Sequence, residues 1–67
     1  MITEIKTFMC NEIPSEEDIE IALKIAKENK IIVELHWPVY ISVYSVTITP
    51  EDTVQSVKNN MPKVYGL

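Results

Sequence analysis

The sequence predicts a small α+β domain whose elements follow the order β-α-β-β-α. Two segments begin with a capping residue and acidic side chains and continue with apolar residues at helical spacing. Three further segments are rich in β-branched and aromatic residues, which is typical of strands. At 67 residues the chain is expected to form a single domain, 1–67, without an internal repeat or a linker.

Local signals predict the first strand and the first helix. Residues 2–10 contain β-branched and aromatic residues and no breaker, so we predict a strand there and a loop over 11–14. Ser15 can cap a helix, because its hydroxyl can accept a hydrogen bond from a free amide of the first turn. The acids that follow it suit the positive end of the helix dipole. A helix is therefore predicted over 16–29.

The first predicted helix is apolar over a wide arc. Ile21 and Ile25 lie beside its central stripe and widen the apolar arc to about 200°, more than a helix on one sheet needs. We expect this flank to meet the second helix, the C-terminal tail or another chain, and we prefer packing within the chain. The central stripe consists of Ile19, Ala22, Leu23 and Ala26.

The second half of the chain predicts two strands and another helix. Residues 31–37 and 39–49 are the predicted strands. Thr49 then fits an N-cap and Pro50 the first helical position, where a missing N–H costs nothing. We expect this helix to run to Asn60 and to end before Pro62. Its apolar stripe is thin and consists of Val54, Val57 and Met61.

The C-terminal residues 63–67 leave the topology open. If they form a short final strand, the arrangement is the split βαβ, ferredoxin-like one. If they form an ordered tail, the sheet has only the strands above, antiparallel or mixed, with both helices on one face.

The connection between the second and third strands decides which side chains face the core, because side chains alternate between the faces of a sheet. A two-residue turn at Trp37 and Pro38 mixes polar and apolar residues on both faces and lacks the positive-φ residues such turns favour. A three-residue loop over 37–39 separates the faces, so we prefer this register. Its core face holds Ile31, Val33, Leu35, Ile41 and Val43. Its outer face holds Ile32, Glu34, His36, Tyr40, Ser42 and Tyr44.

The predicted outer face is a candidate interaction surface. Val46 and Ile48 share its phase, so either a bulge near Ser45 returns them to the core or they extend an outer apolar patch. Such a patch is too apolar to be left to water. We therefore predict that a protein partner, or a second copy of the chain, covers the outer-face residues Ile32, Glu34, His36, Tyr40, Ser42 and Tyr44.

The amino-acid composition excludes or disfavours several classes of function. The formal net charge is −4 and the six basic residues are all lysine, which disfavours nucleic-acid binding. A single glycine, Gly66, excludes glycine-rich phosphate cradles. The single cysteine excludes an internal disulfide and favours a reducing compartment. With no secretory leader or membrane-length apolar run, we predict a cytoplasmic, non-enzymatic interaction or accessory protein that needs no cofactor and forms a homodimer. Its heavy use of Ile, Lys and Asn is typical of bacterial or phage genes.

Three other functions stay open. Cys10 and His36 end the first two strands, and beside Met9 they could bind a soft metal or act as nucleophile and base. Tyr40 and Tyr44 could stack single-stranded bases. The acids at the two helix starts could imitate nucleic-acid phosphates toward an enzyme, although helix capping explains them more simply. These acids are Glu16, Glu17, Asp18, Glu20, Glu51 and Asp52.

Overall fold

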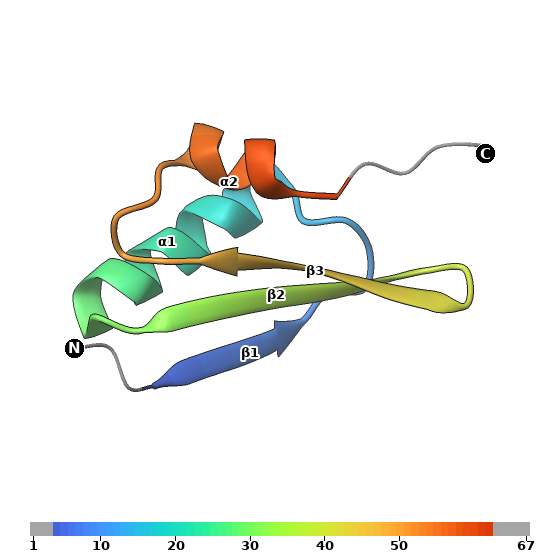
Figure 1. The fold of residues 1–67 in the computed structure, drawn as a ribbon, viewed down its shortest axis with the longest axis horizontal. Coiled ribbons are helices and arrows are strands. Elements are labelled where there is room, and N and C mark those ends of the chain that lie inside the picture. Colours follow the sequence, from blue (N-terminus) through green and yellow to red (C-terminus); the bar gives the residue numbers. More distant parts are fainter. Residues whose placement is uncertain (1–3, 63–67) are drawn as a thin grey trace.

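The computed structural model describes residues 4–62 and confirms the α+β class and the order of the elements (Figure 1). The first strand is shorter than the predicted range 2–10. Residues 1–3 and 63–67, which include the possible final strand, lie outside the described part. The elements are β1 (Ile5–Met9), α1 (Glu16–Asn29), β2 (Ile32–Val39), β3 (Ser42–Ile48) and α2 (Val54–Asn60).

The sheet is mixed and has β2 at its centre. The strand order is β1-β2-β3, with β1 parallel to β2 and β3 antiparallel to it. Because α1 joins two strands that pair directly, the described residues contain an unsplit βαβ unit. In the split, ferredoxin-like arrangement another strand lies between these two, so the observed order differs from that alternative.

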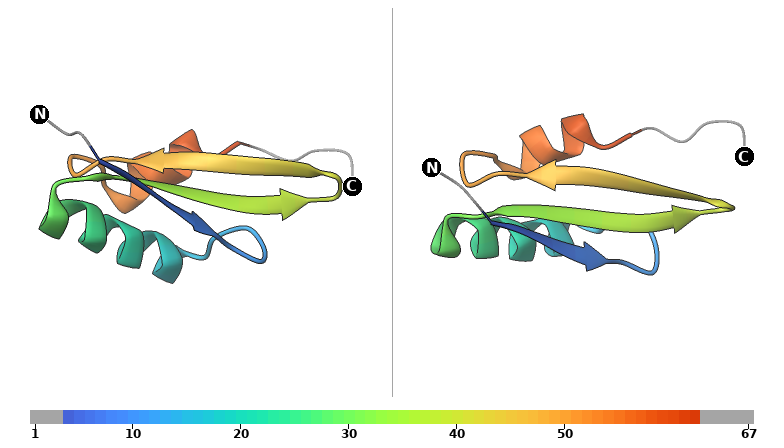
Figure 2. Two further views of the ribbon diagram at one scale, coloured as in Figure 1. Left: turned by 90° about the horizontal axis from the view of Figure 1, so that it is seen from below. Right: turned by 60° about the horizontal axis from the view of Figure 1, so that its bottom comes forward.

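Both helices lie on the same side of the sheet, as predicted (Figures 1 and 2). The predicted stripe of α1 is buried, with Ile19 and Ala26 almost fully shielded from solvent. Ile25 packs partly against the core, whereas Ile21 keeps 55% of its surface exposed. Val57 is the buried residue of α2. The core consists of Ile19, Ala22, Leu23, Ala26, Ile31, Val33, Leu35, Trp37, Val46, Ile48 and Val57.

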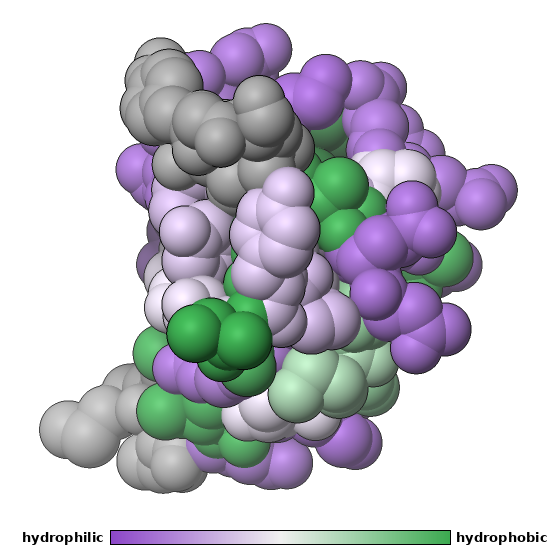
Figure 3. Space-filling view, turned by 90° about the vertical axis from the view of Figure 1, so that its right-hand side faces the viewer, coloured by the Kyte–Doolittle hydropathy of each residue, from purple (hydrophilic) through white to green (hydrophobic). Residues whose placement is uncertain are grey.

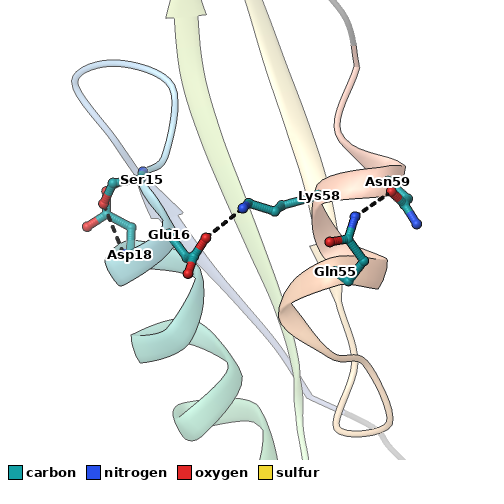
Figure 4. A network of polar contacts seen from close by, with 6 residues as sticks. All are labelled: Ser15, Glu16, Asp18, Gln55, Lys58 and Asn59. Atoms are coloured by element: carbon teal, nitrogen blue, oxygen red, sulfur yellow. Dashed lines mark hydrogen bonds and ion pairs between the residues drawn. The ribbon is translucent and has the colours of Figure 1, made fainter.

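The start of α1 is built as the sequence predicts. Ser15 is the N-cap, and its hydroxyl accepts a hydrogen bond from the Asp18 amide over 3.2 Å. The Asp18 carboxylate accepts one from the Ser15 amide over 3.0 Å, which completes a capping box. Glu16 forms a 2.6 Å ion pair with Lys58 of α2 and so ties the two helices together (Figure 4). Several of the predicted acids therefore have structural partners.

The predicted start of the second helix is wrong. Thr49–Asp52 form a turn in which the Asp52 amide donates to the Thr49 carbonyl over 3.1 Å. The Asp52 carboxylate closes this turn by accepting from the Thr49 amide over 2.8 Å. Pro50 suits the second position of a turn as well as the first position of a helix, because both need the same φ. The helix begins at Val54, where Thr53 and Ser56 form its capping box.

The predicted hairpin register is also wrong. The strands β2 and β3 are joined by a two-residue turn, Tyr40 and Ile41, and the last pair before it is Val39 with Ser42. Trp37 and Pro38 belong to β2 and form no turn. The Ile32 amide and the His36 carbonyl bond to β1, so by alternation the nitrogen of Pro38 also points to that side. Since β1 pairs no further than His36, the missing N–H of Pro38 costs no ladder bond.

The new register changes the two faces of the sheet. Trp37, which was predicted to lie in a loop, is fully buried in the core. Val46 and Ile48 are buried in the core without a bulge, because they pair with Leu35 and Val33. The predicted core residues Ile41 and Val43 are exposed by 102% and 57%. Ile31, Val33 and Leu35 are buried as predicted.

Candidate functional site

The structure divides the six predicted partner-binding residues among three places. Ile32, Glu34 and His36 alternate along β2 on the face away from the helices and are half-buried. Tyr44 pairs with Trp37, shares its face and packs partly against the core, so its predicted position on the outer face is wrong. Ser42 shares the phase of Tyr44, which corrects its predicted face as well. Tyr40 lies in the turn.

Among residues 4–62, the two most exposed apolar side chains lie at the hairpin tip, defined as residues 38–43. Tyr40 and Ile41 have exposed fractions of 81% and 102%. Tyr40 has a φ of 55°, in the left-handed region, and Ile41 does not. A positive φ at the first central residue is the pattern of a type II′ turn, which favours glycine there. The tip projects beyond β1 and both helices (Figure 1), and apolar groups gather at this end of the molecule (Figure 3).

The outer face, the side of the sheet away from the helices, is mixed in character. Glu34 and His36 lie near its centre, with Glu34 Oε1 and His36 Nε2 3.1 Å apart. Ile5 and Met9 of β1 pair with Ile32 and His36 and therefore share this face. Both are largely exposed, at 58% and 67%. This face thus presents a polar pair next to apolar side chains of an edge strand.

Comparison with known proteins does not identify the chain. No family model, no curated protein and no solved structure matches it. Among the described residues, no helix is both long and apolar enough to cross a membrane. The function must therefore be argued from these surfaces and from the chemistry of the side chains on them.

The backbones of Cys10 and His36 are hydrogen-bonded to each other, but their side chains lie apart. Strands β1 and β2 are parallel, as a site shared by Cys10 and His36 would require. The Cys10 amide donates to the His36 carbonyl over 2.6 Å. However, Met9 is the register partner of His36, so the Cys10 side chain points to the opposite face. Within residues 4–62, no three His, Cys, Asp or Glu side chains form a group able to hold a metal ion. The side chains that a nucleophile–base pair needs are thus separated by the sheet.

The Cys10 thiol lies beside an apolar hollow of about 160 Å³ between β1 and α1. Burial raises the pKa of this thiol, and the negative charge of Asp18 raises it further. A raised pKa lowers the fraction of reactive thiolate at neutral pH. The hollow is lined by Phe8, Cys10, Asp18, Ile21, Ala22, Ile25 and Leu35.

Cys10 is therefore expected to be alkylated by iodoacetamide more slowly than the thiol of a free peptide between pH 7 and 8. Replacing Asp18 with asparagine should speed the reaction, because it removes the negative charge while keeping an oxygen that can accept the Ser15 amide. Mass spectrometry over time gives both rates. A rate equal to or above that of the peptide, or no effect of the Asp18→Asn change, would contradict this environment.

Sequence reasoning missed the tip because it placed Ile41 in the core and Tyr40 on a strand. One sequence pattern indicates the observed turn. If Trp37 is paired with Tyr44, the chain reverses at residues 40–41 and Leu35 lies opposite Val46. On the helix side of the hairpin, this register places apolar residues opposite one another from the pair Val33 and Ile48 to the pair Trp37 and Tyr44. The absence of Gly, Asn or Asp at residues 40–41 hid it, since two-residue turns favour those residues.

Proposed function

We propose that this chain is a non-enzymatic interaction protein that binds a partner protein through its hairpin tip. The observation that carries the proposal is the pair Tyr40 and Ile41, which stand almost fully exposed at the end of a projecting hairpin. The partner would offer an apolar pocket that receives these two side chains.

Folding alone does not explain this pair. Ile41 gains nothing from folding, since its exposed fraction is 102%. Tyr40 adopts a left-handed conformation, which costs a residue with a Cβ about 1 kcal/mol or more relative to glycine. Lys30 has a similar φ, but it caps the end of α1, whereas Tyr40 has no such structural role; strain of this kind is found at functional positions as well as at caps and turns. Tyrosine at such a position supplies a large contact area at a low cost in conformational entropy, as in many protein-binding loops.

Other features support binding rather than catalysis. The side chains of Cys10 and His36 lie on opposite faces of the sheet, so they cannot act together on one substrate. Tyr40 lies in the turn and Tyr44 packs partly against the core, so we favour protein binding over the stacking of single-stranded bases on these two rings. The free thiol of Cys10 suits a reducing compartment, and we place the protein in the cytoplasm.

The test compares the wild-type chain with a Tyr40→Gly, Ile41→Thr double variant. Both are immobilised and exposed to an extract of the source cells, and a Lys24→Ala variant of α1 serves as the matched surface control. A specific partner should be retained by the wild type and the control and lost by the tip variant. Each tip side chain is expected to contribute as a hot spot, so the purified partner should bind the double variant at least about 30-fold more weakly in titration calorimetry.

The tip variant should fold at least as well as the wild type, because glycine relieves the strain at position 40. Loss of binding therefore cannot be assigned to unfolding, and circular dichroism checks this directly. Retention of the same partner with unchanged affinity by the tip variant would contradict the proposal.

A further inference from the structure

The edge of β1 that faces away from β2 directs a row of backbone groups outward. The Glu4 carbonyl accepts from the Ile32 amide, and the Cys10 amide donates to the His36 carbonyl. Backbone groups alternate in direction along a strand, so residues 4, 6, 8 and 10 point toward β2. Ile5, Thr7 and Met9 therefore direct their N–H and C=O groups away from the sheet. Within the described residues β1 pairs only with β2.

We propose that two copies of the chain associate through antiparallel pairing of their β1 strands, centred on Thr7. Such pairing continues the three strands of each copy into one sheet across a two-fold axis. In this register Thr7 exchanges both hydrogen bonds with the Thr7 of the second copy, and Ile5 does so with Met9. Every outward backbone group of Ile5, Thr7 and Met9 then has a partner. A shift of the centre to residue 6 or 8 leaves some of these groups unpaired.

The side chains of β1 are self-complementary in the same register. On the outer face, Ile5 of each copy stands opposite Met9 of the other, and these two side chains are exposed by 58% and 67% in the single chain. On the helix side, Lys6 stands opposite Phe8, not opposite its own symmetry mate. The two Lys6 charges therefore do not face each other directly. On the outer face, the exposed side chains of Ile5 and Met9 form apolar pairs.

The hollow beside β1 fits the lysine of a second copy. Phe8 forms part of the lining of this hollow, and Asp18 supplies its negative charge. The Lys6 of the second copy, opposite Phe8, would rise on the same side with its apolar stem over the ring and its ammonium toward Asp18. The helix α1 packs over β2 and β3, and the helix-side residues Lys6 and Phe8 of β1 remain exposed. The edge strand, the apolar lining and the charge thus point to one occupant, a second copy of this chain.

Matched proline substitutions on the two edge strands test the interface. Thr7→Pro removes an outward N–H of β1, and Ser45→Pro removes the corresponding outward N–H of β3, so neither breaks a ladder bond inside one copy. Light scattering on a sizing column across a dilution series gives the molar mass. The wild type and Ser45→Pro should show twice the 7.7 kDa of one chain, and Thr7→Pro should show 7.7 kDa with an unchanged circular dichroism spectrum.

A cross-linking variant decides the matter if a proline disturbs folding. Thr7→Cys in a Cys10→Ser background places two thiols on directly opposite residues, about 5.5 Å apart at Cα, which a disulfide can span. Oxidation should convert this variant to a covalent dimer, whereas Ser45→Cys in the same background should stay monomeric. A wild-type monomer at all concentrations, a dimer that survives Thr7→Pro, or cross-linking through Ser45→Cys in place of Thr7→Cys would overturn the proposal. None of these results depends on the hairpin tip, so they are separate from the test of partner binding.

Discussion

Replacing Trp37 with alanine is expected to lower the free energy of unfolding more than any other substitution discussed below, by about 3–5 kcal/mol. Trp37 is the largest of the fully buried side chains, with no exposed surface. Truncating a buried aromatic residue to alanine typically costs about 3–5 kcal/mol. A chain of this length is stable by about 3–10 kcal/mol in total, at 0.05–0.15 kcal/mol per residue. The substitution therefore removes a large part of the free energy of unfolding.

A phenylalanine at the same position should cost much less. It keeps most of the apolar volume and also removes the indole N–H, which has no hydrogen-bond acceptor among the described residues. An unsatisfied buried donor carries a penalty of about 1–3 kcal/mol, and its removal offsets part of the lost packing. We expect Trp37→Phe to lose less than half of what Trp37→Ala loses.

Urea unfolding followed by far-UV circular dichroism measures these differences. All variants are compared at one protein concentration, because self-association would make the apparent stability depend on it. Ile41→Ala is the matched control, since this equally apolar side chain lies fully exposed at the tip. Its free energy of unfolding should stay within about 0.5 kcal/mol of the wild type. A Trp37→Ala midpoint close to that of the wild type would contradict the position of Trp37 in the core.

Local sequence signals were sufficient to predict the first helix. The N-cap at Ser15 and the buried stripe that includes Ile19 and Ala26 were predictable, because capping and helical periodicity act within a few residues of one another. The order of the elements followed from the same signals. The start of α2 was not predictable in this way, because Thr49-Pro50 satisfies the requirements of a turn and of a helix start equally well. In the structure the Asp52 carboxylate accepts a hydrogen bond from the Thr49 amide and closes the turn.

The hairpin register failed for a different reason. Proline is usually a sign of a turn, so the sequence suggested that the chain reverses at Trp37 and Pro38. Whether proline is tolerated within a strand depends on where its nitrogen points and whether a neighbouring strand is present there. That is a property of the whole sheet, and it could not be derived before the end of β1 was known. Because a register error of this kind moves side chains between faces, half of the predicted interaction surface was misplaced.

The last prediction concerns the dependence of stability on pH through Asp52. Its carboxylate accepts from the Ser56 hydroxyl over 2.6 Å and from the Thr49 amide over 2.8 Å. These hydrogen bonds, that of Ser56 first, and the charge of Lys27 hold the pKa of Asp52 below its ordinary value. Lys27 itself donates to the carbonyls of Pro50 and Asp52, so this turn also fastens α1 to the start of α2.

A lowered pKa in the folded state fixes the sign of the effect. The folded protein binds fewer protons at Asp52 than the unfolded chain when the pH lies near the ordinary pKa. The stabilisation is therefore fully present above that ordinary pKa and is lost as the pH falls through the lower, folded pKa. Asp52→Asn should destabilise the protein by about 1–2 kcal/mol at pH 7, because an amide can replace only one of the two accepting oxygens.

The difference between the wild type and Asp52→Asn should shrink as the pH is lowered from about 5 toward 2, where the wild-type carboxyl becomes protonated. Urea unfolding at a series of pH values measures this difference directly. Glu51→Gln provides the neighbouring control, since this side chain is exposed and lies next to Asp52 without taking part in the turn's hydrogen bonds described above. A constant difference across the pH range, or an equal effect of Glu51→Gln, would show that the Asp52 charge does not stabilise the turn. A difference that disappears in acid would show that the ionised Asp52 stabilises the turn before α2 through its hydrogen bonds from Thr49 and Ser56.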